Sequence, residues 1–430
     1  MRFNTLDEWL RWQESLHSSE IDMGLGRVRE VADRMGLLKP SATVVTVAGT
    51  NGKGSCVTSL QSLLNVSGLN VVSYTSPHLL RYNERIRLDG KPAADALICA
   101  AFERIDQARQ DPLKGDISLT YFEFGTLAAI SVAATEAVDY LLLEVGLGGR
   151  LDAVNILDAD VAVVTSIAQD HEAWLGADLS VIGREKAGVF RAGRPAICAS
   201  ADVPSSVRAW AEELGASYIA AEEGLSWRCE GAVWHWSGLD SMGQVFSLRD
   251  LPLPALPLPS VAAAIQAFVC LGESMTAQHC SALASLSLSG RAQCFERDGV
   301  PIILDVGHNP AAAAYLAERL DTDGCSGDTY FVVAMMSDKD ISAVLAPLLP
   351  LAKGVYLAEL TGNARAASVA QMRAALAACD QYDQFDLSEP GTVVDSLLAA
   401  LETAESGDRV VVAGSFFTVA EALSYLNLEV

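Results

Sequence analysis

The chain has 430 residues, which suits two domains, or three small ones, and is too long for a single small core. Half of the residues are hydrophobic and a fifth are charged, which excludes an intrinsically disordered chain. With 30 basic and 54 acidic side chains the net charge is −24, and a surface this acidic repels phosphate backbones and anionic lipids. We therefore expect no nucleic-acid or membrane binding, and any anionic ligand must be held by a local site.

The cysteines and the amino terminus indicate the compartment. Nine cysteines are scattered along the chain, with no C-x-x-C pair and no zinc-finger spacing to a histidine, which is typical of free thiols in a reducing compartment. The amino terminus has no unbroken apolar stretch, so we expect no signal peptide. The uncharged stretch 251–272 contains four prolines and leaves about 13 helix-compatible residues, too few to span a bilayer. A cytoplasmic protein is expected.

Short β-branched runs alternate with amphipathic stretches through the first half of the chain. The predicted strands are nearly continuously apolar, as strands buried on both faces must be, and lie at 43–47, 71–74, 140–143 and 161–165. Helices are predicted between them, for example at 94–108 and 125–137. This alternation predicts a parallel sheet with right-handed helical crossovers.

The alternation changes between about 225 and 260, where glycines and serines punctuate a tryptophan-containing segment typical of short antiparallel strands. A helix is predicted from Ser260 to about Leu271, and a linker at 285–291. A second α/β alternation follows, with predicted strands at 302–306, 330–336, 354–360 and 409–414. We therefore predict two domains, residues 1–287 and residues 288–430.

The strongest functional signal is the segment 48–55, Ala-Gly-Thr-Asn-Gly-Lys-Gly-Ser, between a predicted strand and a helix-compatible run. Its glycines allow a tight turn that points backbone N–H groups at phosphate oxygens, and Lys53 can bridge the β- and γ-phosphates. The general phosphate-loop pattern is matched imperfectly, because Val47 replaces a glycine and Gly54 replaces the serine or threonine after the lysine. The alternative is a glycine-rich turn without a ligand, but the strand, the helix and the lysine together favour phosphate binding.

Further candidate groups follow other predicted strands of the first half. Glu144 ends an apolar run, where an acidic residue can reach a metal beside bound phosphates. The glycine-rich segment 145–153 follows it and indicates close approach of the backbone to a ligand. His171 lies beyond another strand, although a lone histidine is more often a surface or capping residue.

The second half repeats this pattern around Asp305 and His308, with a strand, an acid, a glycine and a helix start. Arg291 lies just past the predicted linker and could reach across a cleft between domains. By residue type alone, Arg291 is a surface arginine and Lys186 a solvated helix lysine.

Together these segments resemble the Mur-ligase-like amide ligases, and within them the folylpolyglutamate synthase branch. The shared motifs are VAGTNGKGS (47–55), SYTSPHL (73–79), EVGLGGRLDA (144–153), SIAQDH (166–171), IGREKAGVF (182–190), SGR (289–291) and DVGHNP (305–310). Two more segments, IDMGLGRV (21–28) and LTYFEFG (119–125), look like the bacterial bifunctional type, which also makes dihydrofolate from dihydropteroate.

The resemblance implies an α/β fold in which an amino-terminal P-loop, parallel-sheet domain is joined to a smaller Rossmann-like carboxy-terminal α/β domain, with ATP between them. It implies an ATP- and Mg²⁺-dependent ligase that adds L-glutamate to dihydropteroate and to reduced folates through an acyl phosphate. Only these small molecules are expected as partners, and a monomer is expected.

The resemblance also assigns residues. The catalytic candidates are Lys53, Lys186 and His308. The implied ATP-binding residues are Gly49, Thr50, Asn51, Gly52, Lys53, Gly54, Ser55, Ser260, Arg291 and Asp305. The implied magnesium ligands are Ser76, Glu144, His171 and a carbamylated Lys186, in which a cation has become an anionic ligand. The implied pterin-site residues are Asp22, Met23, Thr120, Tyr121, Phe122, Glu123, Leu151, Asp152 and Ala153.

Two positions depart from the family pattern. Ser260 stands where an asparagine is usual, so a contact on the adenine side lacks its amide, and Phe417 stands where a histidine is familiar and receives no role. Three alternatives stay open: a Mur-type ligase for another carboxylate such as a UDP-sugar cell-wall precursor, a P-loop switch or motor NTPase, and a non-catalytic nucleotide-binding module. The intact Lys53, Glu144 and His171 disfavour the last of these.

Overall fold

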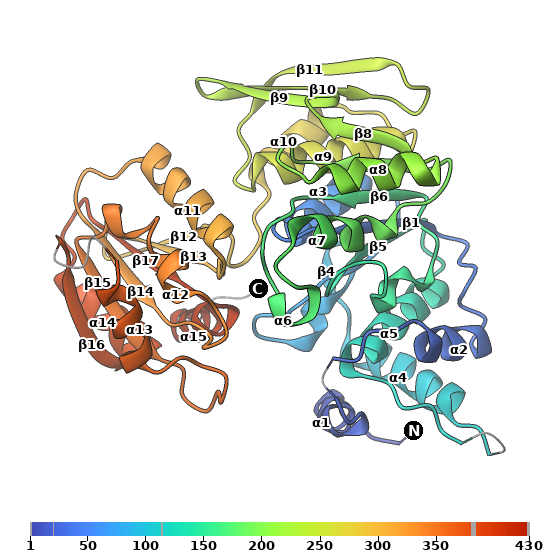
Figure 1. Ribbon diagram of the computed structural model, residues 1–430, viewed down its shortest axis with the longest axis horizontal. Coiled ribbons are helices and arrows are strands. Elements are labelled where there is room, and N and C mark those ends of the chain that lie inside the picture. The colour runs from blue at the N-terminus through green and yellow to red at the C-terminus, as the bar shows by residue number, and fades with distance from the viewer. Residues whose placement is uncertain (1, 20, 113–114, 380–383, 428–430) are drawn as a thin grey trace. The chain divides into compact units, whose positions relative to one another are not determined.

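The computed structural model describes residues 2–19, 21–112, 115–379 and 384–427. The chain divides into two compact units, Met1–Leu286 and Ser287–Val430, and each carries its own β-sheet (Figure 1). Among the helices formed by the described residues, none combines the length and the apolar character that a bilayer span requires.

The sheet of the first unit has 11 strands in the order β11-β10-β9-β8-β7-β6-β1-β5-β2-β3-β4. Its central strands run parallel and are β8 (Ser217–Ala221), β7 (Pro195–Cys198), β6 (Val161–Val164), β1 (Thr43–Ala48), β5 (Tyr140–Glu144) and β2 (Val71–Tyr74). The edge strands, which include antiparallel pairs, are β9 (Gly224–Glu230), β10 (Val233–Leu239), β11 (Val245–Pro252), β3 (Ile86–Leu88) and β4 (Lys91–Pro92). Because β1 lies between β5 and β6, the segments that follow these three parallel strands emerge at the same edge of the sheet.

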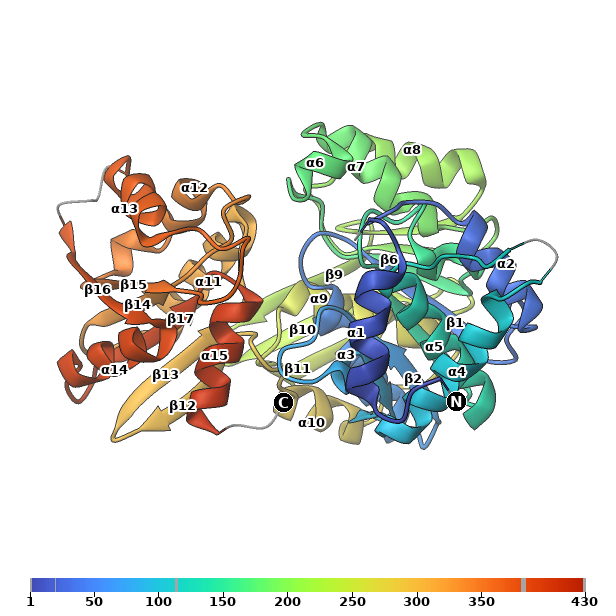
Figure 2. The same cartoon turned by 90° about the horizontal axis from the view of Figure 1, so that it is seen from below.

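Helices cover both faces of this sheet. On one face α3 (Lys53–Val66), α9 (Leu258–Cys270) and α10 (Ala277–Ser285) form a layer in which α3 contacts both other helices. The other helices of the unit are α1 (Leu6–Leu16), α2 (Gly26–Arg34), α4 (Asp95–Arg109), α5 (Tyr121–Glu136), α6 (Glu172–Leu175), α7 (Leu179–Lys186) and α8 (Ser205–Leu214), with short 3-10 turns η1 (Tyr82–Arg85), η2 (Ala153–Ile156) and η3 (Ala187–Val189). In both views α1, α4 and α5 lie side by side (Figures 1 and 2).

The main core of this unit lies between the strands and the layer that contains α1, α4 and α5. Side chains at alternate strand positions, such as Val44, Leu141 and Leu143, are buried there with Trp9 and Phe102. Burial of that apolar area is the chief stabilising contribution to the unit. The strands are buried on both faces, which explains their nearly continuous apolar sequence.

The second unit has a six-stranded sheet in the order β12-β13-β17-β14-β15-β16. Its strands are all parallel except the antiparallel edge strand β12, and they are β12 (Gln293–Arg297), β13 (Val300–Asp305), β17 (Arg409–Ala413), β14 (Thr329–Val333), β15 (Gly354–Glu359) and β16 (Asp386–Thr392). Its helices are α11 (Pro310–Asp323), α12 (Ile341–Leu345), α13 (Val369–Ala377), α14 (Val393–Thr403) and α15 (Phe416–Leu426), with the 3-10 turn η4 (Leu349–Leu351). The predicted α/β class, with a largely parallel sheet in each half, is confirmed.

Candidate active site

The glycine loop between β1 and α3 is fixed by the segment that follows β6. Thr50 N donates to Ser166 O at 2.8 Å, and Thr50 Oγ1 donates to Ala168 O at 3.1 Å. Asn51 N donates to Ser166 Oγ at 3.0 Å, and Thr165 Oγ1 donates to Asn51 O at 2.7 Å. The loop is therefore held in one conformation by its own chain, as a preorganised binding loop must be.

Two glycines are required in this loop. Gly49 has a φ of +139° and Gly52 a φ of +85°, which are backbone conformations that side chains rarely adopt. A Cβ on Gly49 would lie 2.0 Å from Thr165 Oγ1, and one on Gly52 would lie 2.3 Å from Ser260 Oγ. The buried Ser260, which the resemblance relates to the adenine side of ATP, thus lies directly against the glycine loop.

Two lysines meet at this loop. Lys53, the first residue of α3, donates from Nζ to Gly49 O at 3.1 Å and to Thr50 O at 3.0 Å. Lys186, the last residue of α7, is 4% exposed and donates from Nζ to the same Gly49 O at 2.9 Å. Burial, and then the charge of Lys53, lower the pKa of Lys186 to about 7. The interpretation of Lys186 as a solvated lysine, which its residue type suggested, is wrong.

The start of α3 has the features of an anion site. Gly52 is its N-cap residue, so the unpaired backbone N–H groups of the first turn point along the loop. Ser55 is in this first turn, and its buried Oγ has no hydrogen-bond partner among the described residues. An oxygen ligand at this helix end would gain both the helix dipole and the nearby lysine charges.

The four predicted metal ligands occupy different segments at one sheet edge. Glu144 ends β5, is 5% exposed, and accepts from Ser76 N at 3.1 Å, so these two residues are adjacent. Lys186 lies at the glycine loop, and His171 is the N-cap residue before α6, with its Nε2 4.0 Å from Asp170 Oδ2. Within the described ranges, no three His, Cys, Asp or Glu side chains gather as a metal site. The Ser76 hydroxyl, the Glu144 carboxylate and a carbamate on Lys186 would offer the oxygen ligands that Mg²⁺ prefers, whereas His171 offers a ring nitrogen.

Asp152 folds the glycine-rich turn after β5. Its Oδ2 accepts from Gly146 N at 3.0 Å and from Leu147 N at 2.9 Å, and its Oδ1 accepts from Val154 N at 3.0 Å. Burial raises the pKa of Asp152 to about 6, although these three N–H groups oppose the rise. The carboxylate predicted to line the pterin site is thus bonded to the turn itself. Its neighbours in that prediction are the half-buried Leu151 and the buried Ala153.

The other predicted pterin-site segments are connected to each other. Thr120 and Glu123 form a capping box, in which Glu123 N donates to Thr120 Oγ1 at 3.2 Å and Thr120 N donates to Glu123 Oε2 at 2.8 Å. This cap starts α5 before Gly125, the first residue predicted for the helix. Arg27 joins the two segments, because it donates to Asp22 Oδ2 at 2.7 Å and to Glu123 Oε1 at 3.1 Å.

Apolar side chains from both segments reach the turn after β5. A Cβ on Gly146 would lie 2.6 Å from Phe122 Cζ, and one on Gly148 would lie 3.3 Å from Met23 Cε. Met23, Phe122 and the turn therefore form one apolar wall, which suits a flat ring. We call this set, Met23, Phe122 and residues 146–153, the ring wall.

In the second unit, three predicted residues lie near the carboxyl end of β13. Asp305 ends this strand and is half-buried; desolvation raises its pKa, while the charge of Arg291 opposes that rise. The Arg291 guanidinium lies 5.3 Å from the ring centroid of Phe416, and the His308 ring lies 6.2 Å from the same ring. Phe417, the position without an assigned role, is 53% exposed on α15.

Comparison with known proteins shows to which family the chain belongs. Residues 290–416 match the family described as Mur ligase, glutamate ligase domain. The chain is 42% identical to the dihydrofolate synthase/folylpolyglutamate synthase of Escherichia coli (strain K12), over 98% of this chain and 96% of that protein. It belongs to the dihydrofolate synthase/folylpolyglutamate synthase family. The relative from Haemophilus influenzae is 37% identical over 97% of this chain and 96% of its own length.

Solved structures of the family agree with this fold. E. coli FolC in complex with DHPP and ADP has a TM-score of 0.91 and 41% identity, covering 99% of this chain and 98% of that one. The bifunctional synthase of Yersinia pestis complexed with AMPPNP and Mn ion has a TM-score of 0.90 and 42% identity, with the same coverage. The Mycobacterium tuberculosis folylpolyglutamate synthase complexed with ADP has a TM-score of 0.86 and 26% identity, covering 99% of each chain. The resemblance found in the sequence motifs is thereby confirmed.

Sequence reasoning missed one cation beside the site of this family member. The Arg85 guanidinium lies 5.6 Å from the ring centroid of Tyr82 and 5.4 Å from that of Tyr121, and its Nε donates to His78 Nδ1 at 2.8 Å. Burial, and then the Arg85 charge, lower the pKa of His78 to about 4. No spacing in the sequence pointed to Arg85, because Tyr121 becomes its neighbour only when η1 packs against α5.

Proposed function

We propose that the protein is a monomeric, ATP-dependent ligase that adds L-glutamate to dihydropteroate, giving dihydrofolate, and to reduced folates, giving polyglutamates. The observation that carries this proposal is the shared segment after β5. Glu144 begins it beside Ser76, and the turn that follows forms the ring wall with Phe122 and Met23. Asp152 of that turn also lies close enough to Lys53 and Lys186 for their charges to interact. The proposed phosphate loop and the proposed ring-binding surface are therefore neighbours.

The residues present fit a nucleotide and a divalent cation. We propose that residues 49–55 hold the phosphates of ATP, and that Ser76, Glu144, His171 and Lys186 hold Mg²⁺. When bound, the cation supplies charge neutralisation beside the phosphates. Support comes from the relatives whose structures contain ADP, or AMPPNP with Mn.

The chain's part in the reaction follows from these contacts. A carboxylate oxygen of the pterin substrate bonds to the γ-phosphorus while the bond to ADP breaks, and Lys53 neutralises the charge on the transferred group. The amine of glutamate then bonds to the acyl carbon, phosphate leaves, and the amine loses a proton. The rigid glycine loop and the ring wall align the two substrates before either step. From the second unit, we propose that Arg291 and Asp305 contact ATP and that His308 acts in the reaction.

We further propose that Lys186 is carbamylated. Its amine is buried beside the loop, and a pKa near 7 leaves a large fraction of it neutral at physiological pH, the form that adds CO₂. In Lys186→Ala, added short carboxylic acids such as acetate should restore part of the activity, because they replace the missing carbamate oxygens. A fully active Lys186→Ala protein would remove Lys186 from the site.

The deciding experiment mixes the protein, Mg-ATP and L-glutamate with either dihydropteroate or a reduced folate, and follows phosphate release and product mass. We expect products that are heavier by one glutamate residue with both acceptors. Phosphate release stimulated by a UDP-sugar precursor, and not by pterins, would replace this proposal with a cell-wall ligase. Hydrolysis without any carboxylate acceptor would replace it with an NTPase.

A further inference from the structure

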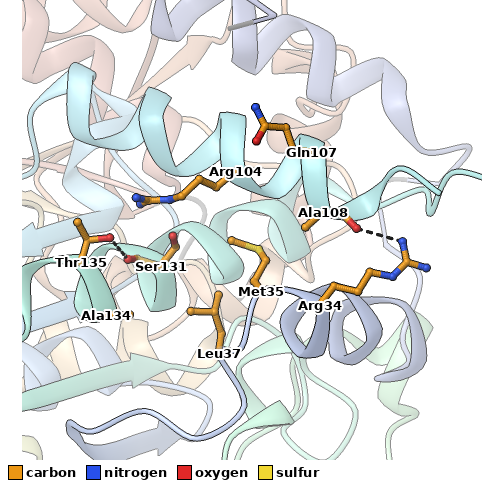
Figure 3. Close-up of a pocket in the computed structure, with 9 residues that line it drawn as sticks. All are labelled: Arg34, Met35, Leu37, Arg104, Gln107, Ala108, Ser131, Ala134 and Thr135. Carbon is orange, nitrogen blue, oxygen red and sulfur yellow. Dashed lines mark hydrogen bonds between the residues drawn. The ribbon is translucent and has the colours of Figure 1, made fainter. Parts of the chain in front are cut away.

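An open pocket of about 500 Å³ lies on the first unit. Figure 3 shows the residues that line it, none of which belongs to the candidate active site. Three segments form it: the end of α2 with the turn that follows, the second half of α4, and the end of α5. The helix α5 begins beside the candidate active site at Tyr121 and reaches this pocket at Thr135, which is about 21 Å further along its axis at 1.5 Å per residue. The pocket is thus a separate site.

Arg104 of α4 has buried guanidinium atoms that the described chain does not satisfy. Its Nε and Nη2 are buried and have no hydrogen-bond partner within the described ranges. Figure 3 shows the guanidinium extending toward Ser131 and Thr135 of α5, where Thr135 Oγ1 donates to Ser131 O at 2.7 Å. Buried charged donors without acceptors are costly, and an anion held in the pocket beside this guanidinium would offset part of that cost.

The second arginine of the pocket is already paired. Arg34 donates from Nη1 to Ala108 O at 3.0 Å and from Nη2 to Glu30 Oε1 at 2.5 Å. Its Nη2 also lies 3.7 Å from Asp111 Oδ2. Arg34 therefore closes one side of the pocket, and the cationic anchor for a ligand is Arg104.

The shape of the pocket and its chemistry select the ligand. Arg104 brings a guanidinium to the wall of the pocket, and a carboxylate is the small anion whose two oxygens match guanidinium N–H donors. Met35, Leu37 and Ala134 supply apolar surface beside it. The volume lies within the range of pockets that take small organic molecules. We propose that this pocket binds a small organic anion, a carboxylate on an apolar body, with Arg104 as its anchor.

The test is calorimetric titration of the full chain with three probes: benzoate, its neutral isostere benzamide, and inorganic phosphate. We expect saturable binding of benzoate, and binding at least about tenfold weaker for benzamide, which lacks the charge, and for phosphate, which lacks the apolar body. Phosphate that binds as tightly as benzoate would overturn the requirement for an apolar body. Benzamide that binds as tightly as benzoate would overturn the role of the charge.

Two variants assign the binding to this pocket. Arg104→Met keeps the apolar stem and removes the charge, and Ala134→Phe fills the pocket from the exposed side of α5 without touching the charge. Each should weaken benzoate binding at least about tenfold. The control Arg208→Met removes an arginine paired with Glu223 elsewhere on the unit and should leave binding unchanged. Neither test variant alters the ring wall, so benzoate binding that survives unchanged in both would belong to the active site and would overturn the proposal.

Discussion

Lys186 Nζ donates a hydrogen bond to Gly49 O at 2.9 Å, and this bond joins the end of α7 to the loop after β1. The lysine is buried, and its nearest described cation is Lys53, which donates to the same carbonyl. Both lysine side chains thus reach one carbonyl oxygen, and Lys53 supplies the positive charge at the loop. This local positive charge can attract an anionic ligand to a chain whose net charge is −24.

The stability of the protein should depend on pH through Lys186. Burial lowers the pKa of Lys186 from 10.5 to about 7, so between these values the unfolded chain binds a proton that the folded chain does not. The free energy of unfolding of the wild type, relative to Lys186→Met, should therefore rise with pH across this window, by up to about 1.4 kcal/mol per pH unit. Urea denaturation of both proteins in CO₂-free buffer measures the difference. The exposed Lys91 provides the control variant Lys91→Met, and a difference that stays flat with pH would contradict the prediction.

Lys53→Ala should lower kcat at least about a hundredfold, because the phosphates lose their central cation and the loop loses two hydrogen bonds. Phosphate release under saturating substrates measures this, with Lys91→Ala as the control that keeps full activity. Retention of more than a tenth of the activity, a loss below ~1.4 kcal/mol in the barrier, would remove Lys53 from the mechanism.

Gly49→Ala should destabilise the protein by about 1–3 kcal/mol more than Gly68→Ala. Both glycines have positive φ, but a Cβ on Gly49 would collide with Thr165, whereas nothing lies within 4 Å of a Cβ on Gly68. Gly68→Ala controls for a positive φ alone, so the excess loss in Gly49→Ala reports the collision together with the larger backbone strain at a φ of +139°. Equal loss of unfolding free energy in the two variants would show that the loop can move away from β6.

Asp152→Asn should cost about 1–3 kcal/mol of unfolding free energy, because an amide supplies one acceptor oxygen where the carboxylate accepts from three backbone N–H groups. Turnover by Asp152→Asn should also fall, because the ring wall is held less rigidly. Asp158→Asn is the matched control, since that exposed carboxylate pairs with Arg191 at the surface and contributes little. Thermal melting of both variants measures this loss. An unchanged melting temperature for Asp152→Asn would contradict the prediction.

The strands of the central sheet were predictable because burial on both faces leaves a direct signature in the sequence. The runs at 43–47 and 140–143 coincide closely with β1 and β5. The strand β16 was missed, since its sequence DLSEPGT contains charges, a proline and a glycine, and only its pairing with β15 at the sheet edge makes it a strand.

Parts of the candidate site were harder to predict than the strands. Glycine positions in the loop and the acid at the end of β5 follow from local chemistry, and the sequence carries both. The hydrogen bonds that join Thr165 and Ser166 to the loop could not be predicted from the sequence. These residues lie more than 110 positions from the loop, and a threonine or a serine is not unusual there. The burial of Lys186 could not be predicted either. A lysine is usually exposed, and this one is buried only because α7 packs on the loop.

The turn after β5 has a further consequence for how this protein can change. A single stretch of ten residues, 144–153, supplies the acid beside Ser76 and also the surface against Phe122 and Met23. Asp152 bonds both halves of that stretch together. If this stretch has the two roles proposed above, residue changes that alter acceptor binding would also alter nucleotide binding. Acceptor preference and nucleotide affinity are therefore expected to evolve as a single trait.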